Sequence, residues 1–128
     1  MAGSKILIIE DNAMNLELAA DLLEANGYVV LKAENALKGI AMAKTDHPDI
    51  VLMDISLPDM DGLEATRELK LDPATRHLPI IALTAHAMKG DEEKALAAGC
   101  QGYLTKPIDT RNFPKQVGQL IAMNRTAK

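Results

Sequence analysis

The chain has 128 residues, which is room for one domain around a single hydrophobic core. Its 14 Lys and Arg against 18 Asp and Glu give a net charge of −4, which argues against nucleic acid as the main partner, because phosphate binding needs a basic face. With no Trp, two Tyr and one Phe, the chain has no stacking platform for bases or sugars, and its core must be aliphatic. The single cysteine, Cys100, excludes an intramolecular disulfide and a cysteine metal cage, and indicates a small buried hydrophobe.

No apolar run approaches the roughly 18 residues that a membrane span needs. The first residues also lack the apolar stretch of a signal peptide. We therefore expect a cytoplasmic protein with no membrane partner.

Short apolar runs alternate with longer segments of helical periodicity along the chain. The runs are each about five residues long, and most are rich in Val, Ile or Leu and bounded by Gly, Pro or polar residues, as buried strands are. The predicted strands cover residues 5–9, 28–32, 49–53, 79–83 and 101–104. The predicted helices cover residues 14–26, 36–44, 63–71, 88–98 and 110–123.

Two of the helical segments carry further detail. In the first, Met14, Leu18, Leu22 and Ala25 fall on one face, which predicts that this face is buried. In the last, Pro114 cannot donate a backbone hydrogen bond. We therefore expect that helix to begin late or with an irregular first turn.

Five repeats of strand and helix predict an α/β fold, in which a five-stranded parallel sheet is doubly wound with helices on both faces. Right-handed crossovers leave only a few possible strand orders. Such sheets bind ligands outside the carboxyl ends of the strands, at the point where the strand order reverses. We expect one domain spanning residues 1–128, with its core at about residues 5–122.

Polar residues follow four of the predicted strands. Glu10 and Asp11 follow the first, Asp54 the third, Thr84 the fourth and Lys106 the fifth, after Thr105. Each alone has an ordinary interpretation as a helix cap, a turn residue or a solvated lysine. Together they bring three carboxylates, a hydroxyl and an ammonium group to the one sheet edge where this fold places its site.

In the strand order 2-1-3-4-5, the first and third strands are neighbours about 4.8 Å apart, so Asp11 and Asp54 can face one another. Carboxylates this close repel at neutral pH and need a cation, and Lys106 can neutralise only one of them. Oxygen ligands with open positions favour Mg²⁺ over Ca²⁺. Such an ion beside a hydroxyl and a lysine is typical of phosphoryl transfer. Because no nucleotide-binding loop is present, the phosphoryl group must come from elsewhere, with Asp54 as its nucleophile.

Four short motifs occur in order and in register with the predicted strands. They are Glu10-Asp11, MDISLPDMDG at residues 53–62, LTA at residues 83–85 and YLTKP at residues 103–107. With them the chain resembles the response-regulator receiver (CheY-like) family of two-component signalling over about residues 5–122. The resemblance implies a flavodoxin-like sheet of order 2-1-3-4-5.

The resemblance also implies a phosphorylation site. Asp54 would accept a phosphoryl group from a histidine kinase or a phosphotransferase. Mg²⁺ would be held by Asp11, Asp54 and the backbone carbonyl of Ser56, with Glu10 acting through water.

The remaining implied roles concern the phosphoryl oxygens and a conformational switch. Thr84 and Lys106 would bind the phosphoryl oxygens, small Ala85 would leave the phosphoryl group accessible, and the Lys106–Pro107 peptide is expected to be cis. Phosphorylation would draw Thr84 inward and let Tyr103 rotate into the vacated space. The surface formed by the fourth helix, the fifth strand and the fifth helix would then change shape.

Two stretches, residues 11–15 and 84–93, are similar to single-domain cell-cycle or polarity regulators of the DivK kind, and equally to the receiver modules at the ends of hybrid histidine kinases. His86 and Ser56 flank the expected phosphoryl site and would tune hydrolysis. The alternative interpretations are an exposed loop residue for His86 and a static, half-buried aromatic for Tyr103.

We expect a stand-alone, phosphorylation-activated switch that binds a downstream protein target. It would be no enzyme apart from Mg-dependent self-phosphorylation and autodephosphorylation. One alternative is a phosphorelay intermediate cut from a hybrid kinase. A more distant one is a phosphatase with an aspartyl-phosphate intermediate, which Ser56 disfavours because that enzyme needs a second acid two residues after Asp54. A phosphorylation-independent adaptor is a further alternative. It would lack Asp54, Thr84 or Lys106, and all three are present.

Overall fold

The computed structural model describes residues 3–84, 89–105 and 110–126, in which strands and helices alternate. The strands are β1 Lys5–Ile9, β2 Val29–Ala33, β3 Ile50–Asp54, β4 Ile80–Thr84 and β5 Gly102–Thr105. The helices are α1 Ala13–Glu24, α2 Ala36–Asp46, α3 Gly62–Leu71, α4 Lys89–Ala98 and α5 Phe113–Thr126. All neighbouring strands are parallel, and their order is β2-β1-β3-β4-β5, which confirms the predicted doubly wound, flavodoxin-like sheet.

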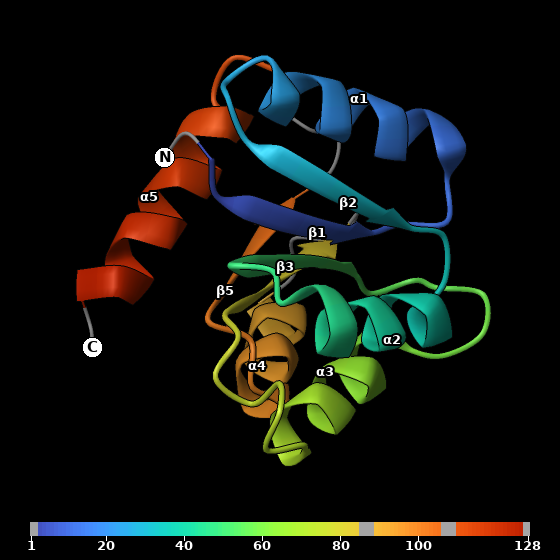
Figure 1. Cartoon of the computed structure of the whole chain (residues 1–128). Coiled ribbons are helices and arrows are strands. Elements are labelled where there is room, and N and C mark those ends of the chain that lie inside the picture. The colour runs from blue at the N-terminus through green and yellow to red at the C-terminus, as the bar shows by residue number, and fades with distance from the viewer. Residues whose placement is uncertain (1–2, 85–88, 106–109, 127–128) are drawn as a thin grey trace.

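The sheet is the middle of three layers (Figure 1). Helices α1 and α5 cover one face, and α2, α3 and α4 cover the other. In β1, Ile6 and Ile8 pack toward α1 and α5, whereas Leu7 and Ile9 pack toward the opposite layer. Both faces of this strand are therefore buried, which is why it is apolar throughout and does not alternate with polar residues.

Strand β1 has the bounds that the sequence predicts, and β2 to β5 each begin and end one residue later than predicted. The later ends have a consequence for the site. Asp54 and Thr84 are the last residues of β3 and β4, and are not the first residues of the following loops. The amide of Ile55 still donates to the carbonyl of Leu83 at 3.1 Å, so the backbone on both sides of Asp54 is held by the sheet.

Helix α1 buries a different face from the one predicted. Met14 is 83% exposed and Leu18 is 41% exposed. The residues that α1 buries are Leu16, Ala19, Ala20 and Leu23. Both stripes are apolar, and the one chosen carries two alanines, whose small side chains let the helix lie close to the sheet.

Helix α5 begins late, as Pro114 predicts. Its first residue is Phe113, and the amide of Gln116 donates to the carbonyl of Asn112 at 2.8 Å. Pro114 therefore stands in the first turn, where an amide has no partner within the helix. In the part of the chain that the structure describes, no helix is both long and apolar enough to cross a membrane.

Gly39 brings α2 against β1. A Cβ at this position would overlap Cδ1 and Cγ1 of Ile9, a side chain with no exposed surface. The close approach of α2 to the sheet therefore depends on the absence of a side chain at residue 39.

We predict that Gly39→Ala destabilises the protein by about 1–3 kcal/mol, although alanine is the better helix former, because the new methyl group overpacks the core. Urea denaturation measures the change. Ile9→Val removes Cδ1, so the double variant should be more stable than the sum of the two single effects predicts. Additive losses would contradict the proposed overlap.

Candidate functional site

The pairing of β1 with β3 brings acidic side chains together at the carboxyl end of the sheet. Ile9 is the partner of Met53, so the residues that follow them, Glu10 and Asp54, lie side by side. Carboxylate oxygens of Glu10, Asp11 and Asp54 lie within 4.8 Å of one another. We call these three residues the acidic cluster.

The members of the acidic cluster differ in burial. Glu10 is 2% exposed and Asp54 is 3% exposed, whereas Asp11 is exposed. The backbone amide of Glu10 donates to the carbonyl of Ala33 at 3.0 Å, and its carboxylate accepts from the amide of Asn12 at 3.3 Å. Two buried acids are thus fixed beside a third that faces solvent, which leaves the cluster open on one side.

The loop between β3 and α3, residues 55–61, is closed tightly at its base. The amide of Ser56 donates to Oδ1 of Asp54 at 3.0 Å, and the amide of Gly62 donates to the carbonyl of Ile55 at 2.9 Å. A Cβ at Gly62 would overlap the backbone carbonyl of Asp54 and Cα of Ile55, so only glycine fits here. This base keeps Ser56 next to the phosphoacceptor candidate, Asp54.

The other predicted site residues fall into two groups. Thr84 is buried at the end of β4, the strand beside β3, and Tyr103 is half-buried on β5 against the core under α2, α3 and α4. Four predicted residues lie outside the described part of the chain: Ala85, His86, Lys106 and Pro107.

Three carboxylates within 4.8 Å of one another constitute a strongly negative site. Their mutual repulsion favours binding of a cation. An all-oxygen donor set with one open side is the chemistry that Mg²⁺ prefers, because this ion keeps several of its waters. The residues present therefore fit a magnesium ion.

Residues 6–118 match the family described as the response regulator receiver domain. This chain belongs to the response regulator receiver family. Over 108 residues it is 47% identical to the polar-differentiation response regulator DivK of Brucella ovis, a match that covers 84% of this chain and 88% of DivK. The acidic cluster thus lies at the active site of a receiver domain, at the carboxyl edge of the sheet.

Solved structures agree with this assignment. The receiver domain of sensor histidine kinase PA1611 from Pseudomonas aeruginosa is 37% identical, with a TM-score of 0.85 over 94% of this chain and 99% of that one. In that structure a magnesium ion is coordinated in the active-site cleft. A CheY-like receiver domain protein from Methanospirillum hungatei, 28% identical, has a TM-score of 0.88 over 99% of this chain and 100% of its own.

One residue of this receiver was not singled out by its sequence. Asp59, at the tip of the β3–α3 loop, accepts hydrogen bonds from the amides of Ala36 and Leu37, each at 3.0 Å. These hydrogen bonds hold the pKa of Asp59 below its usual value. Its partners lie more than 20 residues away in the sequence. In the sequence, Asp59 is an acidic residue within a turn-rich segment, and this local pattern does not indicate that Ala36 and Leu37 are its hydrogen-bond partners.

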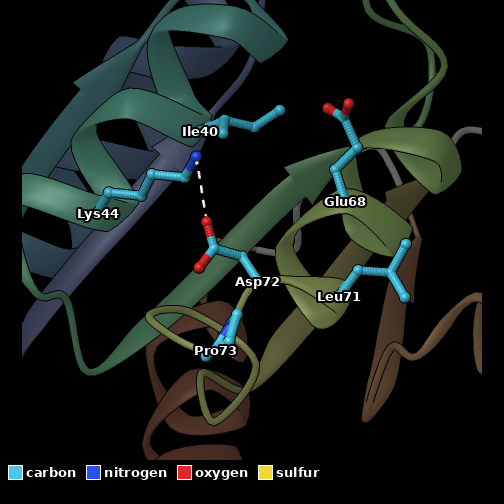
Figure 2. Close-up of a pocket in the computed structure, with 6 residues that line it drawn as sticks. All are labelled: Ile40, Lys44, Glu68, Leu71, Asp72 and Pro73. Atoms are coloured by element: carbon cyan, nitrogen blue, oxygen red, sulfur yellow. Dashed lines mark ion pairs between the residues drawn. The ribbon is translucent and has the colours of Figure 1, made fainter.

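A hollow between α2 and α3 is lined by Ile40, Lys44, Glu68, Leu71, Asp72 and Pro73 (Figure 2). It is crossed by an ion pair of 3.2 Å between Lys44, near the end of α2, and Asp72, just after α3. In a βα fold the helices end at the opposite edge of the sheet from the ligand site. The hollow is therefore separate from the receiver active site.

We predict that Asp11→Asn raises the thermal midpoint in magnesium-free buffer by a few degrees, because it removes one of three mutually repelling charges. The same variant should reduce the stabilisation that added Mg²⁺ gives the wild type, since binding to the folded state stabilises it. Differential scanning calorimetry with and without Mg²⁺ measures both effects. Glu93→Gln, an exposed acid on α4, is the control and should leave both unchanged.

Proposed function

We propose that this receiver is a phosphorylation-activated switch that accepts a phosphoryl group on Asp54 in a magnesium-dependent reaction and signals by binding another protein. The observation that carries this function is the position of Asp54, buried at the end of β3 with Glu10 and Asp11 within 4.8 Å. The family match and the magnesium-bound relative, 37% identical, support the same function.

In the proposed reaction, a carboxylate oxygen of Asp54 attacks the phosphorus of a phosphohistidine on the donor protein. An O–P bond forms as the P–N bond breaks, and the electron pair leaves with the imidazole, which takes up a proton from water. The Ser56 amide, which donates to Oδ1 at 3.0 Å, fixes the rotation of the carboxylate during this attack.

We assign the metal ligands to Asp11, Asp54 and the carbonyl of Ser56, with Glu10 acting through water. A bound Mg²⁺ would offset the charge that develops on the phosphoryl oxygens. Glu10 and Asp54 are held by backbone amides in the unphosphorylated protein, so little rearrangement is needed to form this ligand set.

The phosphoryl oxygens would be bound by the Thr84 hydroxyl and the Lys106 ammonium group. Small Ala85 would leave the phosphoryl group open to water, and His86 together with Ser56 would tune its hydrolysis. These roles follow from the family's motif, in which each residue type stands at the matching position.

The donor would be a histidine kinase or a histidine phosphotransferase in the cytoplasm. Helix α1 starts directly after the acidic cluster, and its exposed Met14 and Leu18 form an apolar surface beside the site. A donor protein that brings its histidine to Asp54 would cover this surface, because apolar side chains at the centre of an interface contribute most of its stability.

The output would use the face formed by α4, β5 and α5. Tyr103 lies half-buried on β5, and β5 pairs with β4 so that Thr84 and Thr105 are partners. A displacement of Thr84 toward the phosphoryl group is therefore one strand away from Tyr103, close enough to change its packing.

A stand-alone switch of one domain over residues 1–128 and a relay intermediate from a hybrid kinase remain two versions of this function. The likeness to DivK, named a response regulator, favours the first, and the likeness to the receiver of a sensor histidine kinase favours the second. The lifetime of the phospho-aspartate distinguishes them, because a relay intermediate is drained by a phosphotransferase.

We predict that a small phosphodonor with Mg²⁺ adds one phosphoryl mass to the intact protein, read by mass spectrometry. Asp54→Ala should abolish the addition, and the matched exposed variant Asp21→Ala should retain it. Modification that persists in Asp54→Ala would refute Asp54 as the acceptor. Sustained hydrolysis of an unrelated phosphomonoester would instead support a phosphatase.

We predict that beryllofluoride, which mimics the phosphoryl group on an aspartate, shifts NMR signals of Tyr103 and of residues 93–98 in α4 as well as those at the strand ends. A shift beyond the site is expected because the switch is a change of population between two packed states. Shifts confined to the strand ends would count against the proposed output face.

A further inference from the structure

We propose that Asp59 is a positioning residue for the receiver active site. It anchors the tip of the β3–α3 loop to the amino end of α2 and thereby keeps the Ser56 carbonyl directed toward the acidic cluster. This role depends on the proposed function, because it concerns the affinity of that site for Mg²⁺.

The anchor uses both oxygens of one carboxylate. Oδ1 of Asp59 accepts from the amide of Ala36 and Oδ2 accepts from the amide of Leu37, each at 3.0 Å. These are the first two amides of α2, which have no partner within the helix. Asn35 caps the third, that of Lys38, at 2.8 Å. With two parallel bonds, the carboxylate cannot rotate without losing one of them, and the positive end of the helix dipole favours its charge.

The position of the loop tip determines the direction of the Ser56 carbonyl. The amide of Ser56 is fixed on Asp54, and a β-bridge joins Ser56 to Asp61 at the base of the loop. The carbonyl belongs to the peptide between Ser56 and Leu57, so it turns with the chain that leads to the tip. Leu57 and Met60 pack on the core, and Asp59 between them is exposed. Its two hydrogen bonds therefore supply a polar restraint that ties the tip to α2.

The far end of the same two helices carries a chemically similar tie. The carboxylate of Asp72 pairs with Lys44 of α2 at 3.2 Å (Figure 2). It also accepts a hydrogen bond from the amide of Ala74 at 2.8 Å. Asp59 and Asp72 thus both join α2 to the α3 region through a carboxylate. Of these two ties, only that of Asp59 belongs to the loop that follows Asp54 and bonds the amino end of α2, so Asp72 offers a matched control.

The test measures the dissociation constant of Mg²⁺ itself by titration of backbone amide signals in ¹H–¹⁵N NMR. We expect Asp59→Ala to weaken Mg²⁺ binding by about three- to tenfold, at or below the lower end of the effect that loss of a residue holding a metal ligand produces, because Asp59 acts through the loop and not on the ligand itself. Asp59→Asn retains one acceptor oxygen and should have the smaller effect. At saturating Mg²⁺, both variants should be phosphorylated by a small phosphodonor at close to the wild-type rate.

Two control variants separate positioning from other effects. Glu34→Gln removes an exposed negative charge next to the amino end of α2 without removing the anchor, and should leave the Mg²⁺ affinity nearly unchanged. Asp72→Asn removes the far tie and should lower the thermal midpoint without changing the Mg²⁺ affinity.

Three results would overturn the positioning role: an unchanged Mg²⁺ affinity in Asp59→Ala, an equal loss in Glu34→Gln, or a phosphorylation rate that stays low at saturating Mg²⁺. An unchanged affinity would mean that the loop keeps its position without the anchor. An equal loss in Glu34→Gln would mean that Asp59 affects Mg²⁺ binding only through its negative charge. A wild-type protein that neither binds Mg²⁺ nor accepts a phosphoryl group would instead refute the proposed function, whatever the Asp59 variants do.

Discussion

The register between β1 and β3 is the constraint on which the active site depends. Because Ile9 is paired with Met53, the residues that follow them, Glu10 and Asp54, lie at the same level of the sheet edge. The side-chain period of a strand is two, so a slip of one residue would exchange the side chains of β1 between the two helix layers and lose close fits such as that of Ile9 against Gly39. The packing of the buried β1 side chains therefore fixes the distance between the carboxylates of Glu10 and Asp54, which lie beyond the end of β1. The buried side chains are those of Ile6, Leu7, Ile8 and Ile9.

That constraint acts against the electrostatics of the site. Two buried acids and one exposed acid within 4.8 Å repel one another, and the folded protein tolerates them because the core and the backbone amides of Asn12 and Ser56 hold them in place. The mutually repelling carboxylates lie where a cation would bind and where a phosphoryl group would be attached. Local strain of this kind is characteristic of functional sites.

Much of this architecture follows from the sequence, because strands buried on both faces and bounded by turn residues are unmistakable in β1 or β3. The acids at the strand ends follow from the fold's topology. Two features could not be predicted. The buried face of α1 depends on whether Ala19 or Leu18 fits closer to the sheet, a packing decision that periodicity does not make. The partners of Asp59 lie on α2, and a contact across that sequence distance needs the assembled tertiary structure.

The strand order divides the active site between the two halves of the chain. Glu10, Asp11 and Asp54 are complete once β1, β2 and β3 have paired, whereas Thr84 and Tyr103 belong to β4 and β5. Within the sheet, the halves join along one seam, where β3 meets β4 and Asp54 is the partner of Leu83. The proposed cation site and its proposed readout are thus encoded in consecutive segments, so recombination between related receivers at this seam would exchange one and conserve the other.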